Sequence, residues 1–283
     1  MSDELCSLHS ALRSFADASA TQSQEHIKPL HWHIAERLVL EGGFAPEDIT
    51  PRPPLRVEST GTGRERRYRL IYDPAVAQSG EQIVLGGLKT KLVDVVVSNR
   101  EIGPCLAVSV KGSLNAFRNL TNRMEEAAGD CTNLHLVYPA MVYGFLHILK
   151  ANREQDVESR NDIAVHAPGA ISPGITRYHE AMARLSGRRD VRDDVSRYES
   201  VAIIFAGTRQ SGLGDVLPLF PPSSSPLAVD RFFPKLYEIY DLRFVYSAPA
   251  LEGRTRRLEW ASDSPVLDLA KQAGFHPRVG EVG

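Results

Sequence analysis

"KLVDVVVSNREIGPCLAVSVK", residues 91–111, contains two apolar runs separated by a polar stretch. That stretch collects residues that favour turns through their backbone preferences or local hydrogen bonds, namely Ser98, Asn99, Gly103 and Pro104. The pattern predicts a β-hairpin with strands at residues 92–97 and 105–111.

Each apolar run also contains polar residues. A turn near residues 101–103 sets Asp94 opposite Ser109 or Lys111. Because side chains alternate along a strand, Ser109 and Lys111 share one face. The other face is predicted to be apolar and to contain Val93, Val95, Val97, Val108 and Val110. The hairpin therefore has a polar cluster at its open end.

The rest of the chain alternates helical and strand patterns. Helices are predicted at 9–24, 28–44, 114–128 and 174–187, and strands at 66–73, 81–85 and 200–207. Residues 133–145 are typical of a strand, with or without a following helix, and residues 231–246 of a helix or a helix and a strand. This order predicts an α/β protein with a central mixed β-sheet flanked by helices.

The chain has 283 residues and a formal net charge of -2, which excludes a strong global basic field. We expect one domain over 1–283, with an N-terminal helical part (1–50), a catalytic core (about 51–150) and a C-terminal α/β part (151–283). Three cysteines without zinc-ligand spacing indicate a reducing compartment. With no leader-like start and no apolar run long enough to span a bilayer, a cytoplasmic protein is expected.

The helix predicted after the hairpin carries the next acidic residue. Its apolar residues Phe117, Leu120, Met124 and Ala128 fall on one stripe, and Arg118, Asn122 and Glu125 fall on the neighbouring stripe. If the apolar stripe packs on the sheet, Glu125 lies at the margin and can reach Asp94 and Lys111. Two carboxylates can hold Mg²⁺, and the lysine can stabilise negative charge on a phosphate.

These residues resemble the core of the PD-(D/E)XK nucleases, with Asp94 followed by Ser109-Val110-Lys111. Val93 stands in place of the usual proline, and Ser109 in place of the second acid. The branch of type II restriction endonucleases that recognise CCGG-containing sites has the same serine, and its second acid lies about fourteen residues after the lysine, where this chain has Glu125. The resemblance also implies a further metal-binding glutamate on an N-terminal helix, for which Glu36 is the counterpart.

The resemblance implies a Mg²⁺-dependent restriction-endonuclease-like enzyme that cuts double-stranded DNA. Asp94, Glu125 and Glu36 would bind the metal and Lys111 would assist the attacking water. The residues expected near DNA are Ser109, Asn115, Arg118, Asn122 and Arg123. The branch's arginine–acid–arginine cluster is not reproduced, because no acid lies between Lys111 and Glu125. A homodimer or homotetramer is implied by a palindromic site, as is a companion methyltransferase that acts on the same site without binding this protein.

Two alternatives stay open. One is a nuclease with the same core that acts in defence or repair, and the other is a DNA-binding protein with an inert core. His31 and His33 are expected to be packing or surface residues, because residues two apart do not share a helix face. The basic runs at 64–69, 186–192 and 253–257 are typical of solvated faces, although together they make local phosphate contacts plausible.

Overall fold

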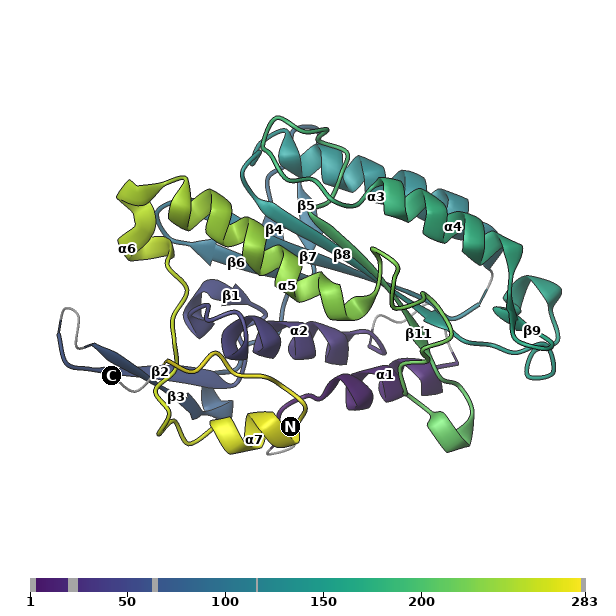
Figure 1. Ribbon diagram of the computed structural model, residues 1–283, viewed down its shortest axis with the longest axis horizontal. Coiled ribbons are helices and arrows are strands. Elements are labelled where there is room, and N and C mark those ends of the chain that lie inside the picture. The colour runs from purple at the N-terminus through teal and green to yellow at the C-terminus, as the bar shows by residue number, and fades with distance from the viewer. Residues whose placement is uncertain (1–3, 20–24, 63–65, 116, 281–283) are drawn as a thin grey trace.

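A computed structural model describes residues 4–19, 25–62, 66–115 and 117–280. Its centre is a five-stranded sheet in the order β1-β6-β7-β8-β11 (Figure 1). The strands are β1 (Ile49–Thr50), β6 (Val95–Asn99), β7 (Gly103–Ser113), β8 (Val142–Lys150) and β11 (Ser200–Ala206). Strands β1, β6 and β7 pair antiparallel, whereas β7, β8 and β11 pair parallel. The predicted mixed sheet is confirmed.

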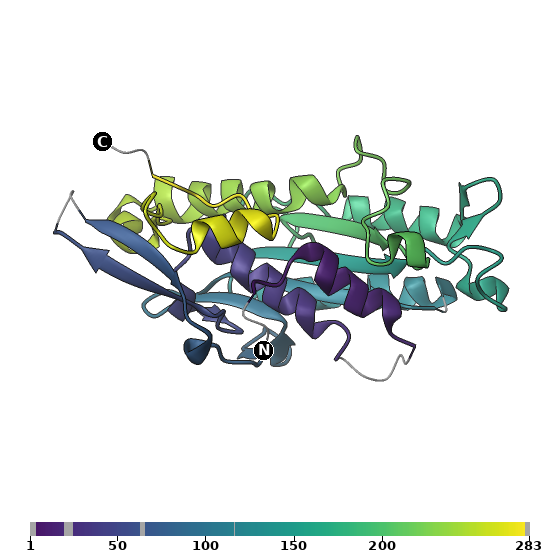
Figure 2. The same cartoon turned by 90° about the horizontal axis from the view of Figure 1, so that it is seen from below.

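Helices cover both faces of this sheet (Figures 1 and 2). One face packs against α1 (Leu8–Asp17), α2 (Lys28–Leu40) and α5 (Val229–Tyr240). The other packs against α3 (Leu120–His135) and α4 (Pro173–Arg184), which lie side by side. Strands β8 and β11 and the middle of β7 are buried and largely apolar for this reason, as parallel strands between two helical layers usually are.

Smaller elements complete the fold. Strands β2 (Leu55–Thr60) and β3 (Arg67–Tyr72) form a projecting arm, visible in Figure 2, and further pairs are β4 (Gln82–Val84) with β5 (Lys91–Val93) and β9 (Val165–His166) with β10 (Ala170–Ile171). Short helices are α6 (Glu252–Thr255) and α7 (Leu267–Gln272). The 3-10 turns are Pro46–Asp48, Pro74–Val76, Phe117–Asn119, Arg160–Asp162, Gln210–Gly212 and Pro249–Leu251.

The parts predicted along the chain share one sheet. Strand β11 and helix α5 belong to the C-terminal part, yet β11 pairs along β8 from Ser200 to Ala206. Helix α5 approaches β8 closely at Gly144, where a Cβ atom would lie 2.7 Å from the Phe232 ring. Trp260, fully buried, donates its indole N–H to the carbonyl oxygens of Val39 and Leu40 at the end of α2. The first and last parts of the chain are therefore packed together.

The predicted hairpin is confirmed, with Val95 opposite Val108 and Val97 opposite Leu106. The same register places Asp94 opposite Ser109. Helices bury both faces of the hairpin, the predicted apolar face included. Val93 also packs on the opposite side from Val95 and Val97, since the chain bends at Asp94 and the alternation of side chains restarts there.

The helix after the hairpin differs from its predicted form. It begins with a 3-10 turn at Phe117–Asn119 and continues as α3 to His135, beyond the predicted end at 128. A 3-10 turn has three residues per turn, so a stripe counted from Phe117 at α-helical spacing goes out of phase. The buried apolar residues of α3 are Leu120, Ala127, Cys131 and Leu134, and Met124 and Ala128 are only half-buried.

Other predictions have mixed outcomes. The predicted first helix ends at Asp17, and residues 20–24 of that prediction lie outside the described residues. Residues 133–145 were assigned in the wrong order, because they contain the end of α3 and then the start of β8. Residues 231–246 are helical throughout, with a π-helical last segment at Asp241–Tyr246. Within the described chain, no helix has the length and apolar character to cross a bilayer.

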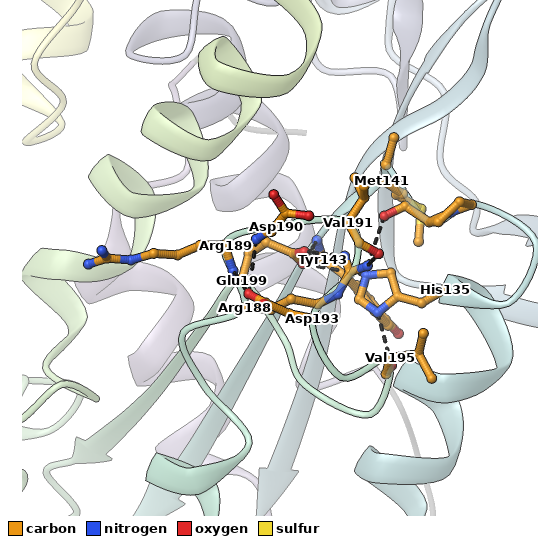
Figure 3. A network of polar contacts seen from close by, with 12 residues as sticks. His135, Met141, Tyr143, Arg188, Arg189, Asp190, Val191, Asp193, Val195 and Glu199 are labelled. Carbon is orange, nitrogen blue, oxygen red and sulfur yellow. Dashed lines mark hydrogen bonds and ion pairs between the residues drawn. The ribbon is translucent and has the colours of Figure 1, made fainter. Parts of the chain in front are cut away.

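A buried charged network joins α3, β8, the segment before β11 and the π-helical segment (Figure 3). One Glu199 oxygen lies 2.8 Å from Arg188 Nη1 and 2.7 Å from Arg243 Nη1. The other accepts the N–H of Tyr143 at 2.7 Å and lies 3.5 Å from His135 Nε2. Burial alone raises the pKa of Glu199, yet its net pKa is lowered by His135, Arg243 and that N–H. Glu199 therefore stays ionised in the core.

Candidate metal and phosphodiester site

The candidate site lies at the end of the sheet where β6 begins and β7 approaches its end. Asp94 occupies the bend between β5 and β6 and is 9% exposed. Its Oδ2 accepts the backbone N–H of Val110 at 2.7 Å, which holds the carboxylate against β7. Burial raises the pKa of Asp94, and the charge of Lys111 and the Val110 hydrogen bond act in the opposite direction. A cation beside Asp94 would relieve the cost of burying this carboxylate.

Lys111 stands on β7 one residue after the Val110 amide that binds Asp94. It is partly buried and forms no ion pair within 4.0 Å with any residue of the described ranges. Its charge acts to lower the pKa of His31 and opposes the raised pKa of Asp94. The structure thus places Asp94 opposite Ser109, two residues before Lys111, and Lys111 has no ion-pair partner among the described residues.

Two residues that the sequence did not single out as ligands complete the group. His31 on α2 places Nε2 3.8 Å from Asp94 Oδ1. Ligand atoms of His31, Glu81 and Asp94 all lie within 4.8 Å of one another. Nε2 of His31 is buried and has no hydrogen-bond partner in the structure. Burial lowers the pKa of His31 to about 4, so the imidazole is neutral near pH 7 and can act as a metal ligand.

A cleft of about 250 Å³ opens beside this group. Its lining includes Lys28, His31, Trp32 and Glu81. Glu81 is half-buried and immediately precedes β4. An ion or a phosphate in this cleft would contact His31 and Glu81, which line it, whereas Asp94 lies behind them and does not line it.

Glu125, the predicted second acid, is exposed on α3 and does not belong to the group around Asp94. The adjacent Glu126 is the glutamate whose pKa depends on Lys111. Burial alone would raise that pKa, but the hydrogen bond from Arg123 and the charges of Lys111, Arg123 and Lys91 lower it. The phase shift caused by the 3-10 turn explains this one-residue rotation of the helix surface.

One turn further along α3, Asp130 is buried and forms an ion pair with Lys91 on β5. Asp130 also contributes to the raised pKa of Asp94. The side of α3 nearest the site therefore contains Glu126 and Asp130 and not Glu125. Asp130 is committed to Lys91, so it is better placed to support the hairpin than to bind an ion.

Glu36 lies on a different side of α2 from His31. It is 2% exposed, and its Oε2 accepts the backbone N–H of Cys6 at 2.7 Å. Burial raises the pKa of Glu36 to about 8, with the Cys6 hydrogen bond acting in the opposite direction. The structure therefore places Glu36 at the contact between α2 and the segment before α1, and not with Asp94.

Replacing Glu36 by glutamine is expected to stabilise the protein at high pH. The folded pKa, about 8, exceeds the ordinary value of 4.5, so wild-type stability falls as pH rises through this interval. Glutamine keeps an acceptor for the Cys6 N–H and does not ionise. Denaturant unfolding should show little gain at pH 5 and a gain of about 2–4 kcal/mol at pH 8. Loss of metal binding in this variant would instead show that Glu36 is a ligand.

The predicted DNA-facing residues divide into two groups. Ser109 is 2% exposed and its hydroxyl lies 2.7 Å from the Tyr143 hydroxyl, so it fixes β7 to β8 and cannot touch a base. The other four, Asn115, Arg118, Asn122 and Arg123, are exposed around the start of α3. Asn115 accepts from Asn152, and Arg123 pairs with Glu126.

Sequence reasoning missed His31 and Glu81 for identifiable reasons. His31 belongs to "LHWHI", where the two histidines cannot share a helix face and so cannot bind one metal ion together. The sequence does not show that His31 could share an ion with ligands on other elements. Glu81 precedes a three-residue strand in a segment without a motif. The one general rule that could have pointed to His31 is that each ring nitrogen of a buried histidine near carboxylates needs a partner.

The arrangement of His31, Glu81 and Asp94 can hold a divalent cation. Two carboxylates and a neutral imidazole fit a divalent cation, while the set Asp94, Glu125 and Glu36 does not, because these three lie in different surroundings. Lys111 supplies a positive charge beside the cation ligands. No protein-family model matches this sequence, and no curated protein matches it significantly. The resemblance to PD-(D/E)XK nucleases therefore rests on residues 92–125 and the helix containing Glu36.

Proposed function

We propose that this protein is a metal-dependent nuclease that hydrolyses phosphodiester bonds of double-stranded DNA. The observation that carries the proposal is the grouping of Asp94, at the bend before β6, with His31 and Glu81, where Asp94 accepts the N–H of Val110, the residue before Lys111 on β7. A mixed α/β sheet with this acid and lysine on adjacent strands agrees with the restriction-endonuclease-like core that the sequence resembles.

The chain's own residues have distinct parts in the proposed reaction. A divalent ion at the site would polarise a phosphate oxygen and lower the pKa of a bound water. Asp94, Glu81 and His31 would hold that ion beside the cleft. Lys111 would donate to a non-bridging phosphate oxygen as negative charge develops in the transition state. A bond from the water oxygen to phosphorus forms, the bond to one sugar oxygen breaks, and a phosphate monoester and a hydroxyl remain.

The exposed start of α3 is the favoured DNA-facing surface near this site. Arg118 is exposed there and makes no ion pair within the described ranges. Elsewhere several arginines of the basic runs are paired with acids, including Arg69 with Asp263, Arg192 with Asp190 and Arg257 with Asp241. Arginine and asparagine at the start of α3 can bond base edges as well as phosphates. Site-specific cutting, as by a type II restriction enzyme, is the finer part of the proposal.

Incubation of purified protein with supercoiled plasmid and Mg²⁺ or Mn²⁺ tests the proposal. We expect linear or nicked products with either or both ions, and none with EDTA. Mapping the product ends on DNA of known sequence separates cutting at a defined site from indiscriminate cutting. Binding of DNA without any cutting under both ions would favour the inert DNA-binding alternative and overturn the nuclease.

Glu125 and its neighbour Glu126 provide a matched pair of substitutions. We expect Glu125→Gln to change the cleavage rate by less than about threefold, because its side chain is exposed and does not belong to the group of His31, Glu81 and Asp94. Glu126→Gln should reduce the rate by about three- to tenfold, because it removes a carboxylate that interacts with Lys111 and Arg123. Single-turnover cleavage rates measure both. If Glu125→Gln lost all cutting and Glu126→Gln did not, Glu125 would be the metal-binding acid that the family resemblance implies.

A further inference from the structure

The unpartnered imidazole of His31 points to the class of metal ion. We propose that His31, Glu81 and Asp94 bind a divalent first-row transition ion such as Mn²⁺ in preference to Mg²⁺. Only the catalytic role of the ion rests on the proposed nuclease function; its binding does not. Mg²⁺ favours oxygen ligands and retained waters, whereas imidazole nitrogen suits transition ions. The Mg²⁺ expected from the family resemblance would have all-carboxylate protein ligands, which this structure does not assemble at Asp94.

The state of the His31 ring supports a ligand role. His31 is 5% exposed, and its Nε2 has no hydrogen-bond partner in the structure. A buried polar atom without a partner costs about 1–3 kcal/mol unless something else satisfies it. The nearest carboxylate oxygen, Oδ1 of Asp94, is at 3.8 Å, too far for a hydrogen bond. An ion between the nitrogen and the oxygen would satisfy both atoms.

The spacing of the three ligand atoms fits one ion after a small movement. Ligands bonded to a single transition ion at about 2.1 Å lie roughly 3–4 Å from one another. The separation of 3.8 Å between His31 and Asp94 already falls in this range, and all three atoms lie within 4.8 Å. Glu81 is half-buried at the edge of the cleft, so it is the side chain with room to close on the ion.

The surrounding charges agree with a cation at this position. Glu81 and Asp94 contribute carboxylate oxygens, and His31 contributes an imidazole nitrogen. Lys28 lines the same cleft as His31 and Glu81, so its positive charge limits the total attraction for a cation. Selectivity between the two ions must therefore come from the nitrogen ligand and not from net charge. An imidazole nitrogen favours a transition ion such as Mn²⁺ over Mg²⁺.

Pulsed electron paramagnetic resonance of Mn²⁺ bound to the full chain tests this inference. We expect a ¹⁴N coupling from the imidazole in the wild type, its loss in His31→Gln and its retention in His33→Gln. His33 is a matched control because it lies on the same helix, is equally buried and also has an unpartnered Nε2. Titration calorimetry should give at least tenfold tighter binding of Mn²⁺ than of Mg²⁺, and this ratio should fall to about threefold or less in His31→Gln.

The outcomes separate this inference from the proposed function. A wild-type Mn²⁺ spectrum without nitrogen coupling, or equal binding of the two ions, overturns the inference even if the protein cuts DNA. Nitrogen coupling that depends on His31, in a protein that cuts no nucleic acid, supports the metal centre and overturns the nuclease. Thermal unfolding of both histidine variants shows whether each is folded. If His31→Gln is unfolded, the presence or absence of nitrogen coupling in the wild-type spectrum decides whether an imidazole binds the ion.

A separate observation concerns an apolar surface beside the site. Six large apolar side chains, each between 36% and 79% exposed, gather on the β4–β5 pair and at the end of α3. They are Ile83, Leu85, Leu88, Leu92, Leu136 and Val137, here called the apolar patch. Ile83 is paired directly with Leu92 across the two strands. The loop between the strands contacts α3, because the Gly87 N–H donates to the Asn133 carbonyl and a Cβ at Gly87 would touch Leu136.

We infer that a second copy of this chain packs on the apolar patch. Side chains exposed to this extent present on the order of 600 Å² of apolar surface, close to the ~800 Å² that each partner contributes to a standard interface. Strand β4 pairs only with β5 within the described residues, so its other edge is also available. Two such edges from identical chains can pair antiparallel about a two-fold axis, which makes the patch complementary to itself.

Sedimentation velocity without DNA tests the second copy. We expect a wild-type dimer at micromolar concentration and a monomer for Leu88→Lys, since Leu88 is the most exposed residue of the patch and a charge there cannot be buried without a partner. Leu242→Lys is the control, because Leu242 is 47% exposed on the π-helical segment and should leave the dimer intact. A monomeric wild type, or a Leu88→Lys variant that still dimerises, overturns the inference whether or not the protein cuts DNA.

Discussion

Lys111→Ala should reduce DNA cleavage by about 10²–10³-fold or more, while DNA binding changes by less than about threefold. The charge of Lys111 acts on the pKa values of Asp94 and His31, but the ammonium forms no ion pair within the described chain, so its removal leaves no buried carboxylate that depended on it alone. The loss should appear in the single-turnover rate, because the charge that Lys111 stabilises develops in the transition state. Gel-shift assays with a non-hydrolysing ion measure binding separately.

The control for this substitution is Lys89→Ala. Lys89 is exposed in the loop between β4 and β5, and Asn133 contacts its backbone. The Lys89→Ala substitution removes one positive charge from the same region without changing a residue of the site. A nonspecific effect of charge would therefore slow cleavage by both variants alike. Equal cleavage by wild type and Lys111→Ala would contradict the proposed mechanism. Equal loss in both variants would show that Lys111 acts through overall charge.

The sheet could be predicted because its signals are local. Turn residues between the apolar runs of 91–111 defined the hairpin, and apolar composition identified the buried strand at 200–207. What local signals could not show was the covering of both sheet faces. An apolar strand shows that it is buried but not which helix covers it, as α5, from a distant part of the chain, covers β8.

The site was predicted only where sequence neighbours determine it. Asp94 lies opposite Ser109, two residues before Lys111, because hairpin register determines which residues face each other, and register can be derived from a turn. Glu125 depended on helix phase, which a single 3-10 turn at Phe117–Asn119 altered. His31 and Glu81 depend on how α2 and the segment before β4 pack on the sheet, and such long-range packing has no signature in one sequence.

Position in the fold also explains why Glu36 and His31 exchange their expected roles. Both lie on α2, and the sequence favoured the glutamate because the family resemblance supplied a glutamate at that place. Which side of a helix faces the site depends on its packing partners. Here α2 turns His31 toward Asp94 and Glu36 toward Cys6, so the histidine and not the acid reaches the site.

The stability of the fold should be most sensitive to Glu199. We expect Glu199→Gln to lower the free energy of unfolding by about 3–5 kcal/mol, because it leaves the Arg188 guanidinium, which is 0% exposed, without a counter-charge. Arg243 loses the same partner. Urea denaturation followed by circular dichroism measures the change. The variant may be compared with Glu252→Gln, whose exposed partner Arg256 is 3.5 Å away and whose loss should cost less than about 0.5 kcal/mol.

A second substitution shows whether the cost comes from charge left unpaired. In Glu199→Gln the network loses one negative charge and retains two arginines, so adding Arg188→Met should restore part of the stability and not subtract further from it. The recovery is expected because a buried apolar side chain has no charge to desolvate. A loss below about 1 kcal/mol in Glu199→Gln, or strictly additive losses in the double variant, would mean that the carbonyl oxygens of Pro139, Val191 and Arg189 already satisfy these guanidinium groups.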